Sequence, residues 1–81
     1  MFEIVGVHFK GGTIDRVKLS NGTMVERKIM LKQIQMGHTF KTKPPLGQEV
    51  HDVKVVIRSG KEMLVTDSTS EDEHLDGVPT F

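Results

Sequence analysis

Glycine-containing turn pairs constrain this chain more than any other feature of its sequence. Asn21 and Gly22 form the strongest of them, because an Asn-Gly pair suits the type I′ turn of a two-residue β-hairpin. Gly11 and Gly12 also stand between two strand-like runs, and glycines adopt the positive φ that a tight hairpin requires. The first third of the chain is therefore predicted to fold as consecutive antiparallel strands.

The runs that flank these turns have the composition of strands. Residues 2–9 read FEIVGVHF and carry apolar side chains on both predicted faces, with Ile4 on one face and Val7 on the other, which predicts a central strand. In residues 13–20 Val17 and Leu19 would face the core, while Ile14 breaks the alternation and indicates a β-bulge near Asp15. Further strands are predicted over residues 23–25, 39–42, 50–58 and 62–66, with a turn at residues 59–60.

A single helix is predicted over residues 27–36. Ile29, Met30 and Ile34 share a stripe at helical spacing, and Gly37 stands where a helix-terminating glycine belongs. The order of elements is then β-β-(β)-α-(β)-β-β. This order predicts an α+β fold, a small and mainly antiparallel β-sheet with one helix packed on it.

Length and composition restrict the classes of protein that this chain can belong to. Its 81 residues suit one small domain with a thin core, so association of copies is expected. It has no cysteine, which excludes disulfides, thiolate catalysis and cysteine-based metal sites. No apolar run approaches the roughly 18 residues of a membrane span, and the N-terminus lacks the pattern of a signal peptide. We therefore expect a cytoplasmic protein with no membrane partner.

The charges are distributed unevenly along the chain. Residues 1–66 hold all 11 Lys and Arg against six acids, a net charge of +5, and the remaining residues hold five acids and no base. This predicts a compact α+β domain over residues 1–66 and an acidic flexible linker over residues 67–74. Residues 75–81 end the chain with apolar side chains, which predicts a C-terminal docking arm in which Leu75, Val78, Pro79 and Phe81 bind the same chain or a second copy.

Three stretches of the sequence carry a family resemblance: IDRVKLSNG at 14–22, SGKEMLV at 59–65 and HLDGVPTF at 74–81. Together with the helix that closes on Gly37, they resemble domain-of-unknown-function family 3892, a family of small bacterial and phage proteins with a terminal NLxxLPxF-like signature. This chain has His74 where the signature often has Asn, and Val78 where Leu is usual. It also lacks a Ser or Asp cap at the helix start and has a longer Pro-Pro-Gly insertion. The resemblance implies a compact autonomous module and no particular activity.

The residue types that carry chemistry form no catalytic pattern. The four histidines lie on different predicted elements without metal-binding spacing, and no serine lies in a GxSxG setting. The acidic run DSTSEDEH lacks the alternation and the glycine of a calcium loop. We therefore predict no enzyme, no metal and no cofactor.

Three functions remain open from the sequence. The first is a non-enzymatic binding or interaction module that works as a small homo-oligomer or with another protein partner. The alternative is a phage-type protein that sequesters a phosphate-containing nucleotide through anion contacts from Arg27, Lys28, Lys41, Lys43 and Arg58. The second alternative is nucleic-acid binding through the basic body, although the chain has no Trp or Tyr to stack on single-stranded bases.

Overall fold

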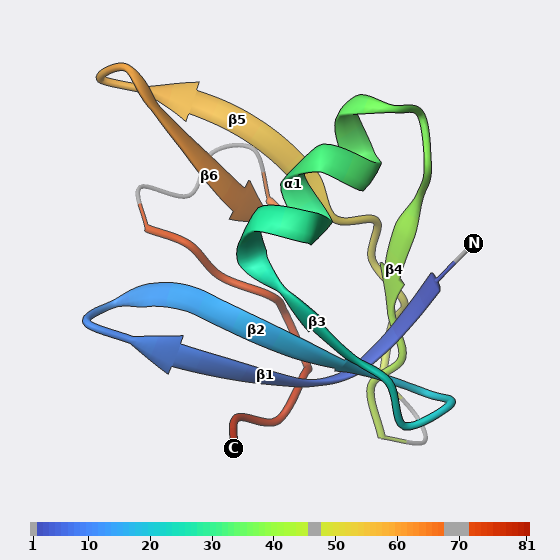
Figure 1. Cartoon of the computed structure of the whole chain (residues 1–81). Helices are drawn as coiled ribbons and strands as arrows, with labels where there is room; N and C mark the ends of the chain where they lie inside the picture. Colours follow the sequence, from blue (N-terminus) through green and yellow to red (C-terminus); the bar gives the residue numbers. More distant parts are fainter. Residues whose placement is uncertain (1, 46–47, 68–71) are drawn as a thin grey trace.

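Six strands and one helix form in the described part of the chain, which comprises residues 2–45, 48–67 and 72–81 of the computed structural model. They follow one another in the predicted order (Figure 1). Their bounds are β1 Phe2–Lys10, β2 Thr13–Leu19, β3 Met24–Glu26, α1 Arg27–Gln35, β4 Phe40–Thr42, β5 Lys54–Arg58 and β6 Lys61–Val65. The α+β class is confirmed.

The strands divide between two sheets. A four-stranded sheet has the order β3-β2-β1-β4, and all its pairs are antiparallel except β1 with β4. A two-stranded sheet consists of β5 and β6. Figure 1 shows α1 beside the β5–β6 hairpin, with both elements on the same side of β1 and β2. The helix therefore covers one face of the larger sheet. No helix of the described residues covers the other face, which is called here the outer face.

The pairing of β1 with β2 is irregular at two places. The register shifts between His8 and Phe9, which leaves Asp15 without a partner and confirms the predicted bulge. A second shift lies between Ile4 and Gly6. Because of it Ile4 and Val7 are both buried in the same core, so the prediction that they lie on opposite faces is wrong.

Helix α1 buries a narrower stripe than its sequence predicts. Met30 is fully buried, and Leu31 and Ile34 pack against the core. Ile29 is 46% exposed, contrary to the prediction that it joins the buried stripe. The helix starts without a side-chain cap and ends before Gly37, both as the sequence predicts.

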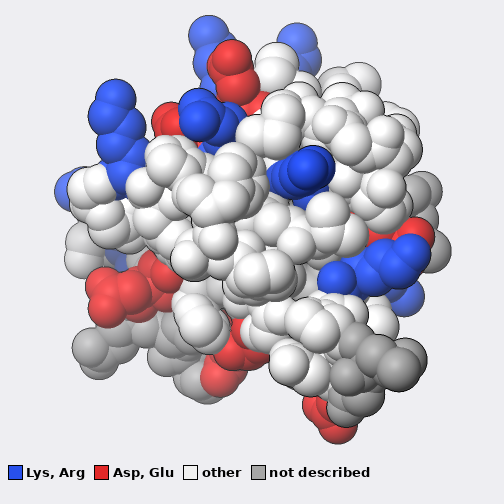
Figure 2. All heavy atoms as spheres, turned by 90° about the horizontal axis from the view of Figure 1, so that it is seen from below, with Lys and Arg blue, Asp and Glu red and all other residues white. Residues whose placement is uncertain are grey.

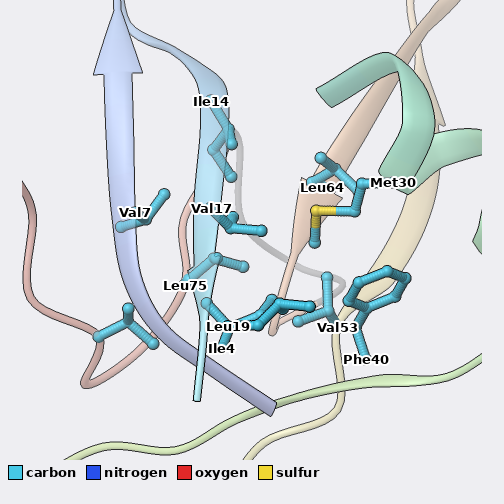
Figure 3. Close-up of a cluster of buried hydrophobic side chains, with 11 residues drawn as sticks. Ile4, Val7, Ile14, Val17, Leu19, Met30, Phe40, Val53, Leu64 and Leu75 are labelled. Carbon is cyan, nitrogen blue, oxygen red and sulfur yellow. The ribbon is translucent and has the colours of Figure 1, made fainter. Parts of the chain in front are cut away.

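One hydrophobic cluster connects the two sheets, the helix and the C-terminal segment (Figure 3). Leu75 and Val78 belong to this cluster, with 3% and 9% of their surfaces exposed. The docking arm is therefore bound to its own chain in this structure. The other members are Ile4, Val7, Ile14, Val17, Leu19, Met30, Phe40, Val53 and Leu64.

Candidate functional site

An ion pair between Arg27 and Glu73 lies in the gap between the two sheets. Strand β3 pairs with residues 16–18 of β2 and stops there, so no strand of the described residues lies beside the edge of β2 at Ile14. The Ile14 amide donates to Oε1 of Glu73 over 2.7 Å, and Nη1 of Arg27 donates to the Ile14 carbonyl over 3.3 Å. The two side chains thus satisfy the groups that a further strand would otherwise satisfy.

The same ion pair also forms hydrogen bonds with main-chain groups at the edge of β6. The Leu64 amide donates to Oε2 of Glu73 over 2.8 Å, and Nη2 of Arg27 donates to the Glu62 carbonyl over 2.8 Å. Nη1 of Arg27 also donates to Oε1 of Glu73. We call this arrangement the Arg27–Glu73 clip, because it joins β2, β6 and the start of α1.

The clip changes the interpretation of both of its members. The Glu73 side chain is 4% exposed, so this residue belongs to the folded body and not to the predicted linker. The Arg27 guanidinium is bound to one carboxylate and two carbonyls of its own chain. The contacts of Arg27 are therefore structural, whereas the sequence predicted that Arg27 binds an external anion. Residues 68–71 of the predicted linker lie outside the described residues.

The five basic residues predicted to bind an anion do not come together in one site. Arg27 and Lys28 line a groove of about 830 Å³ beside the start of α1, and Arg27 and Arg58 line another of about 560 Å³ beside the β5–β6 turn. Lys41 lies on β4, where its Nζ is 3.8 Å from Oδ1 of Asp52, and Lys43 follows that strand. Figure 1 shows β4 and the β5–β6 turn at opposite ends of the molecule.

Bases and acids are nearly balanced in both grooves. Among the described residues, four bases and three acids line the first groove: Arg16, Arg27, Lys28, Lys32, Asp15, Glu26 and Glu62. Three bases and three acids line the second: Arg27, Arg58, Lys61, Glu62, Asp72 and Glu73. The positive field on which a phosphate site depends is thus largely cancelled by neighbouring carboxylates.

The end of the docking arm lies along the edge of β1. The Val7 amide donates to the Pro79 carbonyl and the Phe81 amide donates to the Val7 carbonyl, both over 3.0 Å. These bonds form a parallel bridge between Val7 and Thr80. The arm therefore extends the four-stranded sheet beside the half of β1 that β4 does not reach.

The ring of Phe81 lies against the backbone of β1. A Cβ atom added to Gly6 would lie 3.0 Å from Cδ1 of Phe81, closer than carbon atoms normally approach. The imidazole of His8 lies beside the same ring, with centroids 5.6 Å apart, and its Nδ1 is hydrogen bonded to the Phe81 main-chain oxygen. Glycine in the middle of β1 is thus explained by the close approach of Phe81.

Apolar side chains around Phe81 are exposed on the outer face of the sheet. Phe81 is 48% exposed and Met24 is 44% exposed. A shallow groove of about 350 Å³ runs between these two side chains and is also lined by Val5, Lys18 and Pro79. We call these five residues the Phe81 patch. Figure 2 views the molecule from below, and shows a broad area of uncharged residues with most charged side chains around its margin.

A polar cluster follows the clip at the base of the arm. The Thr66 hydroxyl donates to Oδ2 of Asp76 over 2.8 Å, and Nε2 of His74 is 2.6 Å from Oδ1 of Asp76. The Thr66 hydrogen bond, followed by the interactions with His74, lowers the pKa of Asp76 below its ordinary value of 3.8. Because the hydroxyl bonds to the carboxylate and not to the imidazole, this cluster lacks the nucleophile–base contact of covalent catalysis.

No protein-family model matches the chain, and searches of curated proteins and of solved structures found no match. The resemblance to family 3892 therefore stays a prediction. Among residues 2–45, 48–67 and 72–81, no three His, Asp or Glu side chains gather as a metal site requires. The helix of this part of the chain is too short and too polar to span a membrane.

Proposed function

We propose that this chain is a small non-enzymatic interaction module that self-associates through the Phe81 patch. One observation carries the proposal: two exposed apolar side chains, Met24 and Phe81, flank one groove on the outer face of the sheet. An uncovered apolar sheet face of this kind is typical of a surface that binds another protein. The resemblance to family 3892 agrees with a compact module, and the cytoplasm is the proposed location.

The charges around the patch support a second copy as the partner. Two pairs of oppositely charged residues face one another on the strands that carry the patch and their neighbours, Arg16 opposite Glu26 and Glu3 opposite Lys41. A two-fold contact presents the same surface to itself, and a border that carries both signs can pair without like-charge repulsion.

The size of the molecule limits the affinity that we expect for the dimer. With extents of 35 × 23 × 23 Å, one long face covers about 800 Å², which is roughly what each partner buries in a stable complex. Only part of that face is apolar. We therefore expect a dimer with a dissociation constant on the order of micromolar, below the affinity of an obligate dimer.

Sedimentation equilibrium of a matched pair of variants tests the proposal. Met24→Glu places a charge in the patch, and Met36→Glu places the same charge at a methionine that is 64% exposed outside it. The first variant loses about 1.5 kcal/mol or more of apolar burial on each copy, so its dimer should weaken by about 100-fold. The second should associate like the parent chain. A parent chain that stays monomeric at millimolar concentration, or two variants with equal affinity, would refute the proposal.

Nucleotide sequestration and nucleic-acid binding stay predictions of the sequence. The division of the basic residues and the mixed charge of both grooves give them less support than self-association has.

A further inference from the structure

The tip of the docking arm, residues 78–81, fits a seat that β1 provides for it. The seat consists of Gly6, which leaves room for the Phe81 ring, of Val7, which forms both main-chain hydrogen bonds, and of His8, which binds the Phe81 oxygen. This is the mode in which an extended peptide adds to a sheet edge, with main-chain bonds for affinity and an anchor side chain for specificity.

The tip is held less firmly than the rest of the arm. Leu75 is buried in the core, and the clip fixes Glu73. Beyond Val78, by contrast, Pro79, Thr80 and Phe81 are all exposed, and Phe81 keeps 48% of its surface accessible. A segment with few buried contacts opens at a lower free energy than the core does.

The turn that returns the tip to its own seat is tight. Gly77 has φ of +77°, which only glycine adopts at little cost. A Cβ atom at this position would lie 2.8 Å from Oε1 of Gln48 and 3.1 Å from Cβ of Pro44. The closed turn therefore depends on Gly77, and a rotation there would release residues 78–81 together and withdraw Val78 from the core.

We propose that in the self-associated form the arm tip of each copy occupies the seat of the other copy. This inference rests on the proposed function. The tip and the seat belong to the same outer face, so two copies that meet through the Phe81 patch bring each tip beside the other copy's seat. The exchanged tip regains in the other copy the contacts that it makes within its own chain, including the burial of Val78 in the core, so the exchange costs little beyond opening the Gly77 turn.

Isotope-filtered NMR on the full-length chain tests the exchange directly. Labelled and unlabelled chains are mixed at equal amounts, at a concentration where sedimentation shows a dimer. Exchange predicts intermolecular contacts between the Phe81 ring and the protons of Gly6 and His8. A dimer in which these contacts are only intramolecular would overturn the exchange and leave the proposed function standing. A chain that remains monomeric would overturn both.

A glycine variant gives an independent readout. Gly77→Ala strains the closed turn but not the opened one, so the dimer should become at least about fivefold tighter. Gly60→Ala is the matched control, since Gly60 has φ of +75° in the β5–β6 turn with no other atom near an added Cβ. The control should lower stability without changing dimer affinity. Equal or weaker dimerisation of Gly77→Ala relative to the parent chain would contradict the exchange.

Discussion

Replacing Glu73 by alanine should destabilise this protein more than any exposed substitution. The change leaves the Ile14 and Leu64 amides without their acceptor and Arg27 without its carboxylate. A buried amide that loses its partner costs about 1–3 kcal/mol, and breaking one side of a buried ion pair costs about 3–5 kcal/mol. Because the Arg27 side chain is 26% exposed and can bind water, we expect Glu73→Ala to lower the free energy of unfolding by about 4 kcal/mol in total.

That loss is large for a chain of this size. Domains are stable by roughly 0.05–0.15 kcal/mol per residue, which gives about 4–12 kcal/mol for 81 residues. The assay is urea unfolding followed by far-UV circular dichroism, since the chain has no Trp or Tyr for fluorescence. The control is Asp72→Ala, which removes an exposed neighbouring acid and should change stability by no more than about 0.5 kcal/mol.

A Glu73→Gln variant separates the charge from the shape of the side chain. It keeps one oxygen that can accept a hydrogen bond but turns an amide group toward the second donor, so it should cost less than alanine does. If Glu73→Ala unfolds within about 1 kcal/mol of the parent chain, the Arg27–Glu73 clip does not hold the two sheets together.

Two further predictions concern the arm. Gly6→Ala should lower the free energy of unfolding by about 1 kcal/mol and shift the NMR signals of His8, because the new methyl group would lie 3.0 Å from the Phe81 ring. In a Phe81→Ala background the same substitution should cost nothing. A loss of stability that persists in that background would place its origin elsewhere in β1. Asp76→Asn should make the chain less sensitive to acid. The lowered pKa of Asp76 contributes stability that is present above its ordinary value of 3.8 and is lost as the pH falls through the folded value. Acid unfolding curves of the parent chain and the variant that coincide would contradict this.

The features that the sequence predicts correctly are those with local causes. The turn at Asn21 and Gly22 joins β2 to β3 as predicted, although Asn21 lacks the positive φ of the predicted type I′ turn and only Gly22 has it. The bulge at Asp15 follows from Ile14 breaking the alternation of β2. Helix α1 begins at Arg27 and ends before Gly37, as propensity and the C-terminal glycine indicate. Each of these depends on residues that are close together in the chain.

The features that the sequence does not predict depend on distant contacts. Glu73 stands in a run of polar and acidic residues, and nothing in its composition separates the buried Glu73 from the exposed Asp72. The division of the strands between two sheets likewise depends on the clip that fills the gap between them. One signal was present: Gly6 interrupts an apolar strand, and such a glycine indicates a bulge or the close approach of another segment.

The outer face of the sheet is the centre of this account, and dilution of the labelled chain tests its role most directly. Amide spectra of the full-length chain are recorded from millimolar to low micromolar concentration. Self-association through the Phe81 patch predicts signals that move with concentration at Val5, Lys18, Met24 and Phe81, while those at Met36 and Ile57, both exposed elsewhere, stay fixed. Spectra that do not change with concentration, or changes centred on the β5–β6 hairpin, would contradict the account.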